Sequence, residues 1–410
     1  MPILRFLAEN ARWLGAGAML TFLSSFGQTY FISIFSGEIR EAFALSHGAW
    51  GGIYTLGTTA SAVVMIWAGA LTDRFRSRAL GAWVLALLGV SCLVMAVNPW
   101  AALLPAVIFA LRFFGQGLAS HIANVSMARW FDATRGRALS IAGLGFAAGQ
   151  AVLPVAFVWL LLAMDWRGLW VVSAVVCALA IPLLLWLLQA ERTPQSHARS
   201  VQAAGMGGRH WDRRAVLRHG LFWFMVPALL GPAAFNTAFF FQQVPFAEAK
   251  GWPLIGLVAL FPVYTAMSVA AMLASGWLLD RFGTARLIPW YQLPMVAGFL
   301  VFALGDSLAW ATVGLLFLAL TQGGNATLPP AFWAEFYGTR HLGAIKAMAA
   351  AIMVFGTALG PGLTGALIDA GLGIESQYIY VAGYFVFATA MMAIGVGRVL
   401  RSTPVTAGQP

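Results

Sequence analysis

Long apolar runs recur along the whole chain and alternate with short polar stretches. Twelve runs can be marked, at residues 13–36, 47–71, 79–97, 100–125, 137–162, 168–189, 220–247, 253–279, 286–304, 308–332, 342–367 and 376–400. An apolar run of about 20 residues crosses a bilayer as a helix, and in lipid every backbone polar group needs a partner within the protein. The pattern therefore predicts an all-α polytopic membrane protein with 12 transmembrane helices.

A polar motif between the second and third runs occurs again between the eighth and ninth runs. Five of its residues are repeated at an offset of 207, and in the first copy these are Gly69, Leu71, Asp73, Arg74 and Phe75. The same offset pairs Pro154 with Pro361. A constant register over several runs indicates a tandem duplication. We therefore expect a six-helix half at 1–189, a cytoplasmic linker at 190–219, a second six-helix half at 220–401 and a disordered tail at 402–410.

The composition agrees with a membrane protein, and the placement of charge excludes a nucleic-acid partner. Hydrophobic residues make up 60% of the chain and charged residues 9%, against about 25% charged in soluble domains. Of the 24 Lys and Arg residues, 20 fall on one predicted side, and only Arg40, Arg167 and Lys250 fall on the other. Because basic loops stay in the cytoplasm, we expect both termini there, in a multi-pass protein of the plasma (inner) membrane.

Arg112 is the one formally charged side chain predicted deep within a span. A charge at that depth costs at least about 2.5–3.5 kcal/mol on insertion scales, so it normally faces a cavity or a partner. One interpretation is an anchor for an anionic substrate, and the other is a structural arginine that caps carbonyls or bonds neighbouring helices. No Asp or Glu lies at similar depth. A cation site would lack a counter-charge, so the hypothesis favours an anionic or neutral substrate.

Several motifs resemble the major facilitator superfamily. Gly69-x-Leu71-x-Asp73-Arg74 followed by Arg78 is similar to its signature loop between spans two and three, and Gly276–Arg286 is similar to the weaker second copy. Arg112–Gly117 resembles its span-four arginine motif. Arg129–Phe131 with Arg135–Ala138 is most typical of the monocarboxylate and oxalate–formate porter branch. Span five lacks the proline that drug antiporters carry directly after its second glycine, which lowers the case for a drug antiporter.

The resemblance implies two halves related by a pseudo-two-fold axis, with substrate bound between them near the midplane. Spans one, four, seven and ten line the cavity in this family. The polar residues there that we single out as substrate-binding candidates are Arg112, Gln28, Tyr30, Gln116, Ser120, Asn236, Gln242, Gln322 and Asn325. Bonds between helices are the alternative role for each of them. His121 is a candidate proton carrier, although a satisfied hydrogen bond is the better expectation for it.

The repeated loops are expected to form a cytoplasmic gate, as the resemblance implies. The residues assigned to it are Gly69, Asp73, Arg74, Arg78, Gly276, Asp280, Arg281 and Lys346. The alternative is a simple topology anchor, since any loop with three arginines stays inside. Glycines of spans five and eleven are expected either in a moving seam between halves or in packing within a half. Tryptophans near the external span ends, Trp50 and Trp100 among them, are expected in the interfacial belt.

These observations predict a secondary active transporter that moves a small organic anion, such as a monocarboxylate, by alternating access. Proton coupling stays open. The alternatives are proton-coupled efflux of hydrophobic drug-like compounds and a non-transporting receptor or assembly protein. No cofactor, metal or enzyme activity is expected: the chain has no phosphate-binding Gly-x-x-x-x-Gly-Lys loop, and Cys92 and Cys177 lie inside apolar runs. A small molecule and membrane lipid are the expected partners of a monomer.

Overall fold

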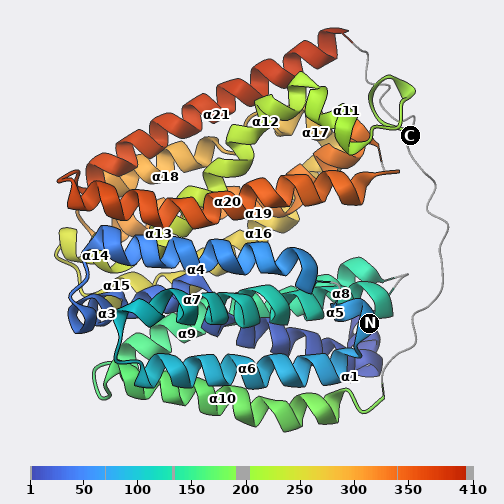
Figure 1. Ribbon diagram of the computed structural model, residues 1–410. Coiled ribbons are helices and arrows are strands. Elements are labelled where there is room, and N and C mark those ends of the chain that lie inside the picture. The colour runs from blue at the N-terminus through green and yellow to red at the C-terminus, as the bar shows by residue number, and fades with distance from the viewer. Residues whose placement is uncertain (1, 70, 132–133, 191–203, 339, 403–410) are drawn as a thin grey trace. The chain divides into compact units, whose positions relative to one another are not determined.

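The protein is all helical over the part of the chain that the structure describes. The structure is a computed structural model that describes residues 2–69, 71–131, 134–190, 204–338 and 340–402. The chain divides into two compact units, residues 1–199 with 240–245 and residues 200–239 with 246–410. Figure 1 shows that helices far apart in the sequence run side by side within a unit, such as α6 with α10. The predicted tail lies almost entirely outside the described residues.

The first unit contains the first six predicted spans. The first is broken into α1 (Pro2–Leu23), η1 (Ser24–Gly27), α2 (Thr29–Ile32), η2 (Ser33–Phe35) and α3 (Ser36–Phe43). The second and third are α4 (His47–Ala68) and α6 (Ser77–Val97), with the short α5 (Leu71–Arg74) between them. The fourth comprises η3 (Ala101–Leu103), α7 (Leu104–Leu111), η4 (Arg112–Ala119) and α8 (Ser120–Trp130). The fifth and sixth are α9 (Arg135–Leu160) and α10 (Trp166–Leu187).

The second unit repeats this plan. It begins with η5 (Met206–Gly208) and α11 (Arg213–Arg218) from the predicted linker. The seventh span is α12 (Gly220–Gly231), η6 (Pro232–Asn236), α13 (Thr237–Phe241) and α14 (Gln243–Ala249), of which 240–245 belong to the first unit. The remaining spans are α15 (Leu254–Val258) with α16 (Phe261–Phe282), α17 (Thr284–Leu287) with α18 (Leu293–Leu304), α19 (Leu308–Tyr337), α20 (Leu342–Asp369) and α21 (Ile374–Ser402).

The helices agree with the prediction of twelve spans. Among the described residues, nine are long and apolar enough to cross a membrane, and the first, bent by 48° near Gly27, makes a tenth. The other two are α18, which is short, and α19, which is 30 residues long but carries polar residues near its middle.

Side chains cap the N-termini of several helices. Asp165, for example, accepts a hydrogen bond from the backbone N–H of Gly168 at the start of α10, as an N-cap residue does.

Three glycines of spans five and eleven pack closely against another helix of their own unit, whereas Gly143 has nothing within 4 Å of an added Cβ. A Cβ on Gly145 or Gly149 would collide with span one, at Ala18 and Ser25 respectively. A Cβ on Gly360 would collide with the Ala234 carbonyl of span seven. Because these glycines bring two helices of one unit together, the structure assigns them to packing within a half.

The expectation of an interfacial position was wrong for Trp50. Its side chain is only 1% exposed, whereas that of Trp100 is 67% exposed. The Trp50 ring stacks on Phe241 with centroids 5.8 Å apart. One helical turn further along α4, Tyr54 packs on the same Phe241. Trp50 is buried because it shares this inward face of α4 with Tyr54.

Candidate functional site

Arg112 lies at the centre of the candidate site in the first unit. It is the first residue of η4, a stretch of π-helix in span four, and is 2% exposed. Its Nη1 donates a hydrogen bond of 3.0 Å to the carbonyl oxygen of Gly27. The same nitrogen lies 3.3 Å from the hydroxyl of Thr29. The arginine is therefore tied to span one at the point where that span is broken.

The break in span one supplies the acceptor for Arg112. Gln28 has extended backbone, with φ −88° and ψ 152°, so the helix is interrupted between η1 and α2. An interrupted helix leaves carbonyls that need partners from elsewhere. The two spans also approach closely here, because a Cβ on Gly115 would lie 2.7 Å from Cα of Gly27. Paired glycines thus let the guanidinium reach the freed carbonyl.

Tyr54 completes the surroundings of the guanidinium. The Tyr54 ring centroid lies 5.4 Å from Cζ of Arg112, within the range of a cation–π contact. The Tyr54 hydroxyl shares a 2.6 Å hydrogen bond with the hydroxyl of Thr29. No carboxylate forms an ion pair with Arg112 among the described residues. The charge is held by one carbonyl, one hydroxyl and one aromatic face.

One edge of the guanidinium has no protein acceptor among the described residues. Both hydrogen bonds come from Nη1, and Nε is buried without a partner. Nε and Nη2 point their N–H groups in parallel, and this is one of the paired edges with which arginine binds a planar carboxylate. A buried donor left unpaired costs about 1–3 kcal/mol. The free edge of Arg112 is therefore suited to an anionic group from outside the chain.

The other candidates of the first unit differ in how far their side chains are buried and hydrogen-bonded. The Tyr30 hydroxyl donates to Ser25 Oγ at 2.8 Å, so it bonds within span one. Gln28 and Gln242 are buried, while Gln116 and Ser120 are half-buried. The sequence interpretation missed Tyr54, because an aromatic residue in an apolar run gives no signal of a polar role.

Gln243 is a further buried polar residue of span seven, which was not singled out with Asn236 and Gln242. Its Nε2 donates to the Tyr30 carbonyl at 3.1 Å and to Ser33 Oγ at 2.8 Å. Its Oε1 is buried and has no partner among the described residues. The pair of adjacent glutamines at 242 and 243 was the available signal, and only the first was selected.

In the second unit, the candidate Asn325 is bonded to a tyrosine and not to a charged group. The Tyr291 hydroxyl donates to Asn325 Oδ1 at 3.3 Å. Gln292 donates from Nε2 to the same hydroxyl at 2.7 Å and to the Ala228 carbonyl at 2.6 Å. Asn236 has a buried Oδ1 without a partner among the described residues, and Gln322 is half-buried. Tyr291 and Gln292 were missed because they lie in span nine, outside the spans that the resemblance singled out.

The first signature loop is fastened to span four of its own unit. His121 Nε2 lies 3.2 Å from the Gly69 carbonyl oxygen, a satisfied hydrogen bond. Arg129 donates from Nη1 to the Thr72 carbonyl at 2.6 Å. Arg78 donates from Nε to the Leu185 carbonyl of span six at 3.2 Å. Both ends of the loop therefore have fixed positions within the first unit.

The remaining gate candidates are exposed or outside the described side chains. Arg74, Asp280, Arg281 and Lys346 are exposed, and Gly276 has open space where a Cβ would stand. The Asp73 side chain lies outside the described part of the structure. In the second copy of the loop, Arg281 lies over the rings of Trp277 and Phe282. The described residues contain no group of three or more His, Cys, Asp or Glu side chains that could hold a metal.

Comparisons with known proteins agree with the fold and the motifs. The sequence matches the pattern of the Major Facilitator Superfamily over residues 17–344. It is 28% identical over 272 residues to monocarboxylate transporter 13 of Bos taurus, which covers 64% of this chain. The chain spans about 60% of the length of that curated relative.

Solved structures of transporters share the fold. A bacterial homologue of the human lysosomal transporter Spinster has a TM-score of 0.73 at 16% identity, covering 97% of this chain and 99% of its own. The nucleoside transporter NupG has a TM-score of 0.70 at 16% identity, covering 93% of this chain and 98% of its own. With its duplicated helices and its signature loops, this multi-pass membrane protein belongs to the Major Facilitator Superfamily of transporters.

Proposed function

We propose that the protein is a secondary active transporter of a small organic anion, with a monocarboxylate as the preferred class of substrate. The observation that carries the proposal is Arg112, buried without an acid partner among the described residues. The name of the bovine relative supports the same substrate class. The candidate positions of the second unit carry amide groups and no charge, so Arg112 is the one charged group among the substrate-binding candidates.

The two interpretations of Arg112 left open by the sequence are compatible. Nη1 serves the structural role, because it holds the Gly27 carbonyl at the break in span one. Nε and Nη2 remain for a carboxylate, and two parallel N–H donors match its two oxygens. Lysine would keep the positive charge but would lose this paired geometry. The proposal therefore depends on the shape of the guanidinium as well as on its charge.

Uptake of a radiolabelled monocarboxylate into proteoliposomes tests the proposal. Both Arg112→Ala and Arg112→Lys are expected to abolish uptake while the protein still inserts and purifies. Arg401→Gln removes one exposed arginine at the end of α21 and serves as the matched control, with uptake expected at the wild-type rate. Wild-type uptake by both Arg112 variants would contradict the anchor.

We also propose that the signature loop gates the cytoplasmic side, with Asp73 bonding to Lys346 or to free N–H groups near the start of span eleven. The precise repeat of the loop and its fixed attachment to span four support this role. Asp73→Asn is expected to change which face of the protein reacts with thiol reagents at introduced cysteines. Unchanged labelling on both faces would reduce the loop to a topology anchor.

A further inference from the structure

Two of the three basic residues on the predicted base-poor side make the same kind of contact. Arg167 and Lys250 each donate to a carbonyl at the end of a helix. The acceptor in the first unit is Ala96, near the end of α6, and in the second unit it is Ala303, near the end of α18. Ala96 and Ala303 are separated by 207 residues, the offset of the internal repeat. The two contacts therefore occur at equivalent points of the two halves.

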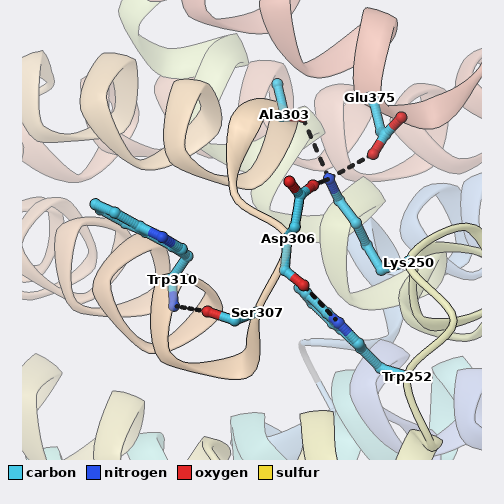
Figure 2. A network of polar contacts seen from close by, with 7 residues as sticks. All are labelled: Lys250, Trp252, Ala303, Asp306, Ser307, Trp310 and Glu375. Atoms are coloured by element: carbon cyan, nitrogen blue, oxygen red, sulfur yellow. Dashed lines mark hydrogen bonds and ion pairs between the residues drawn. The ribbon is translucent and has the colours of Figure 1, made fainter.

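In the second unit, Lys250 links its own segment to two other segments of the chain. Figure 2 shows its Nζ between the Ala303 carbonyl, 3.3 Å away, and the carboxylates of Asp306 and Glu375. The Lys250 side chain is 3% exposed, while those of Glu375 and Asp306 are 48% and 95% exposed. Trp252 adds a 3.3 Å hydrogen bond from its indole N–H to the Asp306 carbonyl. The contact joins the end of the seventh span to the loop after the ninth and to the start of the twelfth.

In the first unit, Arg167 occupies the equivalent point. Its Nη1 donates to the carbonyls of Ala96 and Asn98 at 2.9 and 2.8 Å. Its guanidinium also lies 5.7 Å from the ring centroid of Phe43 and 4.5 Å from that of Trp166. No ion pair of Arg167 is found among the described residues. Here the contact joins the start of the sixth span to the end of the third.

Lys250 and Arg167 do not occupy the same position of the repeat. At the position of each cation, the other half of the chain has an apolar residue. The repeat offset places Lys250 at the register of Phe43, and Ile374 at the register of Arg167. Ile374 is 5% exposed, so it fills its site as a buried apolar residue. In register, each half therefore has one cation and one apolar residue at this pair of positions, and the helix that carries the cation differs between the halves.

Helix physics explains why a cation belongs at this point. The last four carbonyls of a helix have no partner within the helix, and the C-terminus carries partial negative charge. A cation there satisfies the carbonyls and interacts favourably with the helix dipole. Lys250 is almost fully buried, and removing one partner from a buried pair leaves an uncompensated charge. The second unit supplies carboxylates for its ammonium, whereas the guanidinium of Arg167 rests on aromatic rings.

We propose that Arg167 and Lys250 are equivalent cation latches, one in each half. Each latch fixes the end of the third helix of its half to a helix that enters or leaves the same side, so the loops of that half move as one body. The inference concerns how each half stays rigid and is independent of the substrate. It also accounts for two of the few basic residues on that side, since a cation bound to a helix end is not a free surface charge.

A register swap tests the latch directly. Lys250→Phe gives the second half the residue of the first half, and it is expected to lower the melting temperature of the purified protein and to increase amide hydrogen exchange at residues 300–306. Adding Ile374→Arg copies the arrangement of the first half. This second substitution is expected to restore the melting temperature and the slow amide hydrogen exchange at residues 300–306. The reciprocal pair is Arg167→Ile and then Phe43→Lys in the first half, with exchange followed at residues 93–98.

The outcomes separate the proposal from ordinary packing. An unchanged Lys250→Phe variant, or a double variant no better than the single one, overturns the equivalence of the two latches. If the single variant does not accumulate as folded protein, recovery of folded protein in the double variant is the supporting result and its failure is the contradicting one. Asp306→Asn is the matched control: this carboxylate is 95% exposed and 3.7 Å from Nζ, so its loss is expected to change little, whereas Glu375→Gln is expected to destabilise.

Discussion

At the scale of single residues, Arg112 shows how one side chain can serve structure and leave capacity for a ligand. One nitrogen holds the broken first span, and the opposite edge of the guanidinium has no acceptor among the described residues. The depth of Arg112 could be predicted from the sequence, because an arginine in a long apolar run stands out. Its neighbours could not, since neither Thr29 nor Tyr54 is marked by composition or spacing as a partner of span four.

The contact between Gly27 and Gly115 gives a prediction at the same scale. A Cβ on Gly27 would overlap the Leu111 carbonyl and lie 2.8 Å from Cα of Gly115. Gly27→Ala should therefore push spans one and four apart and destabilise the protein by about 1–3 kcal/mol, the usual cost of overpacking. Thermal unfolding in detergent measures the change.

Gly15→Ala is the matched control for that measurement. Gly15 lies in α1 and has nothing within 4 Å of an added Cβ, so alanine there should be neutral or mildly stabilising. Equal melting temperatures for the two alanine variants would show that the close approach at Gly27 does not affect the stability of the protein.

At the scale of elements, the sequence predicted the regular helices well and the interrupted ones poorly. The third span was expected at 79–97 and α6 covers Ser77–Val97, because hydropathy alone marks a continuous apolar helix. The π-helical stretches η4 and η6 were not expected. They lie in spans four and seven, and such stretches often accompany functional sites. Hydropathy does not distinguish a π-helical stretch from an α-helical one, so the pattern of apolar residues gave no sign of either.

The described end of the linker is also an element with its own chemistry. Met206 and Val216 are buried in the core of the second unit. His219, just before α12, has Nδ1 3.2 Å from the Tyr337 hydroxyl, and its ring centroid lies 4.8 Å from that of Trp211. Burial lowers the pKa of His219 below its ordinary value. The neutral imidazole is therefore the form that this packing favours.

This pKa shift predicts a pH dependence of stability. An unfolded histidine titrates near pH 6.5, so the contribution of His219 is complete above about that pH and is lost as the pH falls toward the lower folded pKa. Between pH 8 and pH 5, the wild-type melting temperature should fall further than that of His219→Gln. Parallel curves for the two proteins would show that His219 has no such linkage.

At the scale of the whole molecule, the sequence was most informative. The duplicated loops, the fixed offset and the one-sided distribution of basic residues predicted a membrane transporter of twelve helices, and the family match and structural neighbours confirm this class. These features span hundreds of residues, so single errors at span ends do not erase them. Substrate identity depends on a few side chains whose contacts form only in the fold, and it stays a prediction centred on Arg112.

Ligand-dependent stabilisation tests that central claim most directly. Purified wild-type protein and Arg112→Lys are heated with a panel of small monocarboxylates, each paired with its neutral primary amide. A ligand present at 100 times its Kd stabilises the folded state by about 2.7 kcal/mol. At least one carboxylate should raise the wild-type melting temperature, its amide should not, and Arg112→Lys should respond to neither. If no carboxylate exceeds its amide, or if the lysine variant responds as the wild type does, Arg112 is not the anchor of an anionic substrate.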